Sequence, residues 1–70
     1  MTDLITVSDA DGVRTLRFNR LDKKNAITRA MYAALADSLD EANTRADIRV
    51  VIIAGGEGCF SAGNDMMDFM

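Results

Sequence analysis

The feature that most constrains this chain is an apolar run that leads directly into a glycine-rich stretch. Residues 49–54 read RVVIIA, so both faces of a strand formed there would be apolar. Such a run is typical of a strand buried in a parallel or mixed sheet. Residues 55–70 follow as GGEGCFSAGNDMMDFM, with a glycine loop and then a predicted helix start. Function in α/β sheets gathers beyond the carboxyl ends of the strands, so we expect the site in this stretch.

The upstream elements complete a strand–helix–strand pattern. Residues 4–18 are predicted to form a β-hairpin around Asp11-Gly12, since such a two-residue turn requires positive φ at both positions. Directly opposed residues share a face, so the register gives one apolar and one polar side. Asp9 then lies opposite Arg14, as a charge pair worth little if exposed. The apolar pairs are Ile5 with Phe18 and Val7 with Leu16.

One helix is expected over residues 28–45, after a loop at residues 19–27. Thr28 is the predicted N-cap, and apolar residues then recur at three- and four-residue steps. Tyr32 is expected to pack in the core, together with Met31. The predicted fold is therefore α/β, with a buried strand at residues 49–54. The apolar stripe of the helix consists of Ile27, Met31, Leu35, Leu39, Ala42 and Ala46.

Composition excludes several classes of function. Seventy residues form at most one small domain, and Cys59 as the one cysteine rules out an internal disulfide. The absence of histidine argues against a zinc site, so no metal is expected. The net charge is −3 with scattered basic residues, which argues against nucleic acid as a partner. No run is long enough for a membrane span and no signal peptide is evident, so we expect a cytoplasmic protein. The chain stops within an expected helix, which suggests a piece of a longer protein.

The glycine loop does not match three familiar catalytic or phosphate-binding motifs. A P-loop has Lys after its last glycine, whereas Asn64 follows Gly63. The glycine spacing is too long for a dinucleotide-binding fingerprint. Ser61 lacks the glycine two residues earlier that a nucleophile elbow requires. The chain also has no histidine to activate Ser61 or Cys59. What remains is chemistry of the backbone.

Two interpretations of the turn at residues 62–64 remain open. The turn could leave the N–H of Asn64 directed at a ligand oxygen, as in an oxyanion hole. Alternatively, Asn64 and Asp65 could simply cap the following helix. Spacing alone does not separate the two interpretations. Asp65 and Asp68 lie one helical turn apart, and acids in a first turn usually serve the helix dipole rather than acid–base catalysis.

Three sequence blocks carry a resemblance to a known family. They read NRLDKKNAI at residues 19–27, RVVIIAG at 49–55 and GEGCFSAGND at 56–65. In this order and spacing they resemble the N-terminal part of the crotonase superfamily, the enoyl-CoA hydratase/isomerase fold. The resemblance implies that residues 1–70 are the N-terminal fragment of a crotonase-like domain with a ββα spiral fold. Leu21 departs from the pattern, since the family usually has proline there.

The resemblance also implies positions for a substrate. The backbone carbonyls of Ala26 and Ala62 would accept from the adenine amino group of coenzyme A. The backbone N–H of Asn64 would donate to the thioester carbonyl, as one half of an oxyanion hole. The second donor and the groups that move protons would lie beyond Met70. The implied coenzyme A contacts are Lys23, Lys24, Asn25, Ala26, Ala62, Gly63 and Asn64.

The function implied by this resemblance is hydration or isomerisation of an enoyl-CoA. The partner would be an acyl-CoA thioester, no separate cofactor would be needed, and the full-length protein would be a homo-oligomer. The GND form of the glycine block resembles isomerase-like members more than hydratases. An alternative is a truncated fragment or interaction module without turnover of its own. A dinucleotide-binding βαβ module is a third possibility, which the glycine spacing disfavours.

Overall fold

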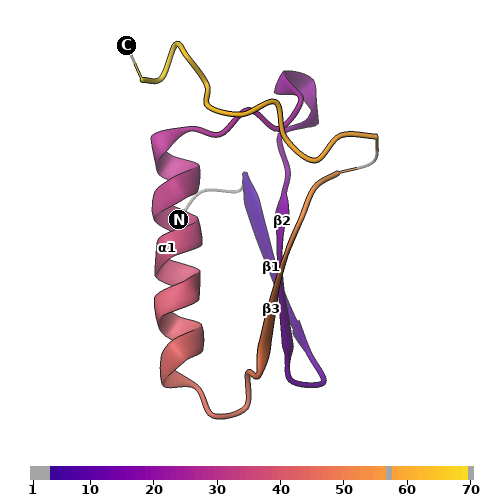
Figure 1. Cartoon of the computed structure of the whole chain (residues 1–70), viewed down its shortest axis with the longest axis vertical. Helices are drawn as coiled ribbons and strands as arrows, with labels where there is room; N and C mark the ends of the chain where they lie inside the picture. Colours follow the sequence, from indigo (N-terminus) through magenta and orange to yellow (C-terminus); the bar gives the residue numbers. More distant parts are fainter. Residues whose placement is uncertain (1–3, 57, 70) are drawn as a thin grey trace.

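A three-stranded sheet and one long helix form the chain in the computed structural model, which describes residues 4–56 and 58–69. The elements in order are β1 (Ile5–Ala10), β2 (Val13–Phe18), the 3-10 helix η1 (Leu21–Lys23), α1 (Arg29–Thr44) and β3 (Val50–Ala54). The helix stands beside the sheet, and the glycine-rich segment crosses above the ends of β2 and β3 towards the start of α1 (Figure 1). The predicted α/β class is confirmed.

The β-hairpin forms as predicted. Asp11 and Gly12 have φ values of 53° and 81°, which are the positive values that the two-residue turn requires. The predicted register is confirmed, with Ile5 opposite Phe18 and all further pairs in step. β2 also pairs in parallel with β3, so the sheet order is β1-β2-β3.

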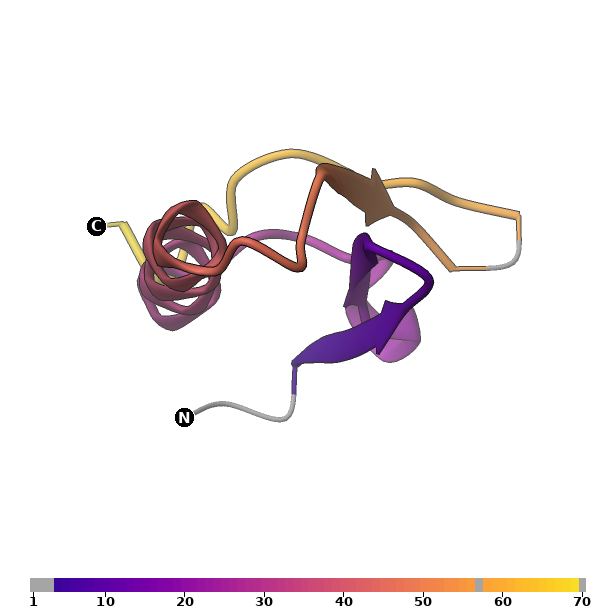
Figure 2. The same cartoon turned by 90° about the horizontal axis from the view of Figure 1, so that it is seen from below.

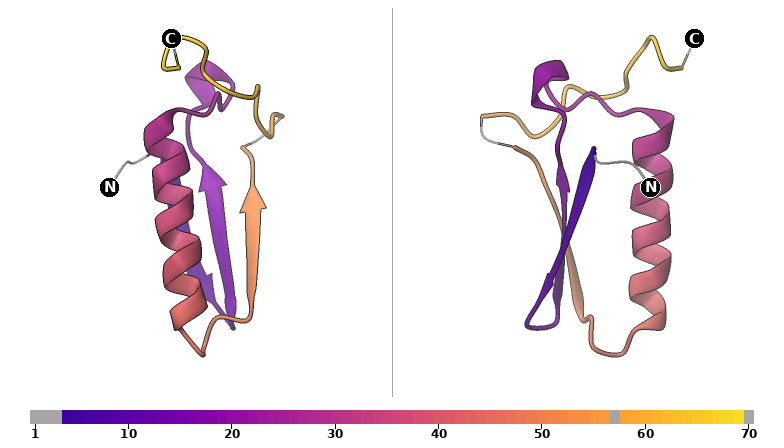
Figure 3. Two further views of the ribbon diagram at one scale, coloured as in Figure 1. Left: turned by 60° about the vertical axis from the view of Figure 1, so that its left-hand side comes forward. Right: turned by 180° about the vertical axis from the view of Figure 1, so that it is seen from behind.

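Helix α1 begins at the predicted cap. The Thr28 hydroxyl accepts a hydrogen bond from the Met31 N–H at 3.1 Å, which satisfies one of the N–H groups that a helix start leaves open. The helix runs alongside the strands on one side of the sheet, and it contacts β1 and β2 (Figure 2). Because β2 and β3 are parallel, their carboxyl ends lie together, at the end where α1 begins (Figure 3). The predicted loop at residues 19–27 is interrupted by η1.

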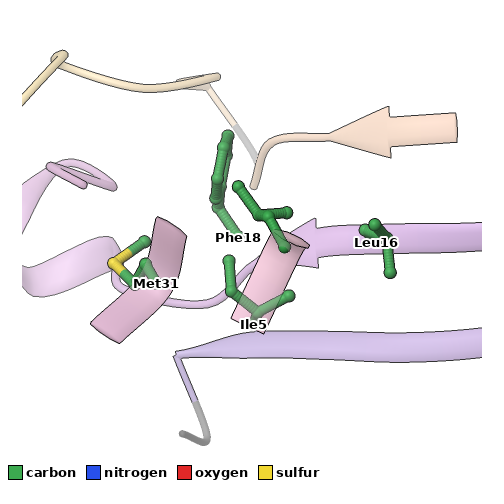
Figure 4. Close-up of a cluster of buried hydrophobic side chains, with 5 residues drawn as sticks. Ile5, Leu16, Phe18 and Met31 are labelled. Carbon is green, nitrogen blue, oxygen red and sulfur yellow. The ribbon is translucent and has the colours of Figure 1, made fainter. Parts of the chain in front are cut away.

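The core lies between α1 and the hairpin. Among the described residues, the fully buried apolar side chains are Leu16 on β2 and Met31 on α1. The core packing expected of Met31 is confirmed, whereas Tyr32 lies outside the core. The buried core cluster consists of Ile5, Leu16, Phe18, Met31 and Leu35 (Figure 4).

The strand predicted at residues 49–54 is confirmed as β3, but its predicted burial is wrong for the described part of this chain. β3 pairs with β2 along one edge only, and it is the last strand of the sheet. The helix packs mainly on β1 and β2, and of the apolar β3 side chains Val51 packs against the core cluster while the others stay largely uncovered. A run of β-branched residues indicates a strand that can be buried, but burial also requires covering elements. Val50, Ile52 and Ile53 are 52%, 47% and 42% exposed.

The charge pair near the hairpin tip is more than an exposed surface contact. The Arg14 side chain is only 3% exposed. Its guanidinium donates to both carboxylate oxygens of Asp9 at 2.8 Å, and also to Glu41 and to the backbone carbonyl of Ser38. Bidentate pairing of this kind is stronger than a single contact. Arg14 therefore connects the hairpin to the C-terminal half of α1. The predicted cross-strand pair of Asp9 and Arg14 did not indicate this contact with the helix.

The Asp9–Arg14 pair gives a pH-dependent prediction. The hydrogen bond from Arg14 holds the pKa of Asp9 below its ordinary value, and the charges of Arg14 and Arg45 add to this effect. A carboxylate whose pKa is lower in the folded state stabilises the fold at pH values above its unfolded-state pKa. This stabilisation is lost as the pH falls through the folded-state pKa. Asp9→Asn is therefore expected to lower the melting temperature at pH 7, with the difference from the parent shrinking below about pH 4.

Thermal unfolding between pH 2 and pH 7 measures this difference. Asp40→Asn is the matched control, because Asp40 is an exposed acid on α1 that forms no ion pair among the described residues. A constant gap between Asp9→Asn and the parent across the whole pH range would contradict the assignment.

Candidate functional site

Two loops that are far apart in the sequence meet at the carboxyl end of the sheet. They are residues 19–27, before α1, and residues 55–65, after β3. Ile27 and Asn64 form an isolated parallel β-bridge. The Ile27 N–H donates to the Gly63 carbonyl at 2.8 Å, and the Asp65 N–H donates to the Ile27 carbonyl at 2.9 Å. A third bond joins the Ala62 N–H to the Lys24 carbonyl at 2.9 Å. The sequence blocks thus pair as a short ladder.

This ladder determines where the Asn64 N–H points. The Gly63 carbonyl and the Asn64 N–H belong to one planar peptide group, and in a trans peptide they point in opposite directions. The Gly63 carbonyl accepts from Ile27, so the Asn64 N–H is directed away from the Ile27 strand. Among the hydrogen bonds of residues 4–56 and 58–69, none uses the Asn64 N–H as donor. The group is thus oriented and available to an external acceptor.

A groove of about 400 Å³ lies at this junction. It brings together four of the residues that the sequence predicted for the site. Lys24, Asn25 and Gly63, which were also predicted, do not line it. The lining residues are Arg20, Lys23, Ala26, Ala62, Asn64, Asp65, Met66 and Met67.

Asn25 supports the loops from inside rather than lining the groove. Its side chain is 0% exposed. The side-chain oxygen accepts from the Arg20 N–H at 2.8 Å, while the side-chain nitrogen donates to the carbonyls of Cys59 and Phe60 at 3.1 and 3.2 Å. Its φ is 55°, in the left-handed region that asparagine tolerates better than most residues. Asn25 therefore holds the first loop against the second.

The other polar groups of the second loop are also engaged. The Ser61 hydroxyl donates to the Asn25 carbonyl at 2.8 Å and accepts from the Gly63 N–H at 3.0 Å. This hydroxyl closes the turn, in agreement with the exclusion of Ser61 as a nucleophile. The Cys59 sulfur lies 3.4 Å from the Lys24 carbonyl. Phe60 packs edge-on against Phe18, with ring centroids 5.2 Å apart.

Asp65 caps the turn that follows Asn64. Its carboxylate accepts from the N–H groups of Met67 and Asp68 at 3.0 and 3.3 Å. Asp65 therefore caps the turn while the Asn64 N–H still points away from the Ile27 strand. The sequence analysis had treated these two arrangements as alternatives. At the predicted helix start the described residues 66–69 form a hydrogen-bonded turn, and no helix is assigned there.

Arg20 is a site residue that the sequence reasoning missed. Its guanidinium donates to the Asp65 carboxylate at 2.7 Å and to the Ala26 carbonyl at 3.0 Å, so it spans the groove from loop to loop. The hydrogen bond from Arg20 is the main cause that holds the pKa of Asp65 below its ordinary value. The sequence offered one signal for a role of Arg20 in the site, namely its place inside the NRLDKKNAI block. Its partner Asp65 lies 45 positions later in the chain.

The first two glycines of the loop are expected to respond differently to substitution. A Cβ on Gly55 would lie 2.3 Å from the Phe60 Cα and 2.7 Å from the Cys59 carbonyl oxygen, and neither backbone atom can move alone. A Cβ on Gly56 would meet the tip of the Leu21 side chain at 2.5 Å, which can rotate away. Gly55→Ala is expected to destabilise the chain by about 1–3 kcal/mol, as overpacking does, and Gly56→Ala by less.

Urea unfolding of the two variants provides the measurement. Gly58→Ala is a further control, because the new methyl group would meet no atom within 4 Å beyond its chain neighbours, but the φ of 75° disfavours alanine. Equal stability of Gly55→Ala and Gly56→Ala would contradict the close approach of residues 55 and 60.

Comparison with known proteins identifies the family. The profile of the enoyl-CoA hydratase/isomerase family matches residues 8–70. Human enoyl-CoA delta isomerase 2 is 33% identical over 67 residues, covering 96% of this chain and 17% of the isomerase. The structure of Pseudomonas aeruginosa OdaA matches with a TM-score of 0.93 and 51% identity, covering 97% of this chain and 28% of OdaA. An enoyl-CoA hydratase/isomerase structure from Pseudoalteromonas atlantica T6c matches with a TM-score of 0.93 and 41% identity, over 97% of this chain and 27% of that one.

The chain belongs to the enoyl-CoA hydratase/isomerase family of the crotonase superfamily. It spans less than a third of the length of each relative named above. In residues 4–56 and 58–69, no helix has the length and apolar character needed to cross a membrane. Nor does this described part contain a group of three or more His, Cys, Asp or Glu side chains that could hold a metal ion.

Proposed function

We propose that this chain is the acyl-CoA-binding N-terminal portion of an enoyl-CoA hydratase or isomerase. In this proposal the Asn64 N–H is one of two oxyanion-hole donors for the substrate thioester. The observation that carries the proposal is the fixed direction of that N–H at the edge of the groove, imposed by the bond from Ile27 to the Gly63 carbonyl. Membership of the family supports the same chemistry.

The chemical role of this donor is to stabilise an enolate. Negative charge grows on the thioester oxygen when a proton leaves the α-carbon or when water adds at the β-carbon. A backbone N–H that already points at this oxygen stabilises the charge without reorganisation, which is the source of its effect on rate. The second donor and the groups that move protons are assigned to sequence beyond Met70.

The remaining groove residues fit the coenzyme A moiety. Lys23 offers a cation to the phosphates, while the small side chains of Ala26 and Ala62 let a ligand approach the backbone. The Ala26 carbonyl already accepts from Arg20, and its second lone pair can accept from the adenine amino group. The Lys24 carbonyl accepts from the N–H of the groove residue Ala62, and Asn25 and Gly63 contribute through the backbone arrangement that they maintain. Coenzyme A arrives as part of the substrate, so no separate cofactor is required.

Two substrate assays test the reaction. The complete natural polypeptide that carries this sequence is given a 3-enoyl-CoA, to follow migration of the double bond, and a 2-enoyl-CoA, to follow hydration. We expect migration to be the faster reaction, because the GND block is isomerase-like and the human relative is named an isomerase. Absence of both reactions would overturn the enzyme proposal.

A binding experiment tests the site apart from turnover. The 15N-labelled chain is titrated with acetyl-CoA and with S-ethyl-CoA, a thioether that lacks only the carbonyl oxygen. We expect the Asn64 amide proton to shift downfield with the thioester and not with the thioether. Equal shifts with the two ligands would show that the carbonyl oxygen does not reach Asn64.

The exposed apolar surface of β3 favours a second candidate, an interaction module without turnover. Val50 and Ile52 are about half exposed on an edge strand, which is a surface open to association. If the chain is such a module, we expect it to self-associate or to bind the dye ANS. A monomer with sharp, cooperative unfolding would count against it. Homo-oligomerisation of the full-length protein and a cytoplasmic location remain parts of the main proposal.

A further inference from the structure

A cluster of contacts joins the first turns of α1 to the segment that begins at Asn64. The Tyr32 hydroxyl donates to the side-chain oxygen of Asn64 at 2.6 Å. The Tyr32 ring stacks on Phe69, with centroids 6.1 Å apart and an angle of 19° between the planes. The Arg29 N–H, at the start of the helix, donates to the Asp68 carboxylate at 2.6 Å. Residues 64–69 are therefore fastened to α1 at three points.

Core packing does not account for Tyr32, although the sequence favoured that role. The side chain is 45% exposed, while the neighbouring Met31 is fully buried. Consecutive helical residues point about 100° apart, so Met31 and Tyr32 cannot both face the core centre. The phenol hydroxyl instead reaches Asn64, the groove residue whose backbone N–H is directed away from the Ile27 strand.

The contact from Tyr32 adds a restraint that the β-bridge lacks. The Ile27–Gly63 hydrogen bond sets the direction of the peptide that carries the Asn64 N–H. The ladder bonds on either side of Asn64 hold its backbone against residue 27, but they do not tie Asn64 to α1. The hydrogen bond from Tyr32 to the Asn64 side chain supplies this tie, and small displacements of a catalytic donor reduce rates strongly.

We propose that Tyr32 is a positioning residue for the thioester site, acting through the Asn64 side chain. Its hydroxyl and ring hold Asn64 and the following turn against α1, so the donor N–H is in place before substrate arrives. This inference rests on the proposed function, because it concerns how the proposed donor is held.

Tyr32→Phe provides the direct test, since it removes only the hydroxyl and keeps the stack on Phe69. In the complete natural polypeptide, we expect kcat to fall about 3- to 10-fold, the effect of one hydrogen bond, with KM within about twofold of the parent. Thr44→Val removes one hydroxyl from the other end of α1, where Thr44 bonds the Glu41 carbonyl, and is expected to leave kcat unchanged. Parental kcat in Tyr32→Phe would overturn the inference.

A double-variant comparison shows whether the hydroxyl acts through Asn64. Residues that act as one unit have non-additive effects, so Tyr32→Phe combined with Asn64→Ala should lose no more activity than Asn64→Ala alone. Fully additive losses would overturn the route through Asn64.

A measurement without turnover separates this inference from the proposed function. The 15N order parameter of the Asn64 backbone amide is expected to decrease in Tyr32→Phe relative to the parent and to Thr44→Val. If the parent converts no enoyl-CoA, the proposed function fails and the order parameter alone decides the positioning role. An unchanged order parameter would overturn that role.

Discussion

Replacing the Asn64 backbone amide with an ester is expected to lower kcat by about 10²- to 10³-fold, the typical effect of losing one oxyanion-hole donor. The ester exchanges the N–H for an oxygen and leaves every side chain in place. Because the Asn64 N–H makes no hydrogen bond among the described residues, its removal breaks no existing bond, while the Gly63 ester carbonyl still accepts from Ile27, more weakly than the amide. The measurement is enoyl-CoA turnover by the complete natural polypeptide carrying the ester, made by semisynthesis.

Two outcomes of the ester experiment are informative. KM should change little if the donor acts mainly in the transition state, because such interactions raise kcat rather than ground-state binding. The same ester at Gly63 serves as control, since the Gly63 N–H bonds the Ser61 hydroxyl within the turn and Gly63 does not line the groove. Retention of parental kcat by the Asn64 ester would exclude this N–H as an oxyanion donor.

Asn25→Ala is expected to lower the free energy of unfolding by on the order of 3 kcal/mol, because it leaves three backbone partners of a fully buried side chain without their bonds. The loss should also separate the two loops, since Asn25 joins the Arg20 N–H to the carbonyls of Cys59 and Phe60. Urea unfolding measures the first effect. The Asn64 amide shift reports the second, because the groove is built from both loops.

Controls for Asn25 separate the hydrogen bonds from the backbone geometry. Asn25→Gly accepts the φ of 55° without strain but loses the same bonds, so it should remain strongly destabilised. Lys24→Gly, at the adjacent φ of 52°, should change stability by less than about 1 kcal/mol. If Asn25→Gly matched the parent, backbone conformation rather than hydrogen bonding would explain the buried asparagine.

The sequence predicted where the candidate site would lie, but not which contacts would build it. The glycine loop after the apolar run left backbone donation and simple capping as alternatives, and the resemblance assigned the donor to Asn64 and named the residues around it. The structure brings Lys23, Ala26, Ala62 and Asn64 to one groove. The N–H direction, however, is set by Ile27, a residue for which the pattern predicted only an apolar role on the helix stripe.

The structure also differs from the predictions for Arg14 and Tyr32, in both cases because of how α1 packs against the hairpin. Arg14 looked like half of a surface pair, yet α1 packs over it and adds Glu41 and the Ser38 carbonyl as partners. Tyr32 looked like a core residue, but its position one residue after Met31 turns it away from the core. Reading the 100° step between neighbouring helical residues would have indicated this.

The sequence by itself determined the structural elements that depend on local interactions. The Asp11-Gly12 turn, the Thr28 cap and the spacing of Met31 and Leu35 act over a few residues, through sterics and short hydrogen bonds. The tertiary structure alone decided the contact between Ile27 and Asn64, because such contacts depend on how distant segments pack. It also decided that Val50, Ile52 and Ile53 of β3 stay exposed: apolar residues permit burial, and only a covering element produces it.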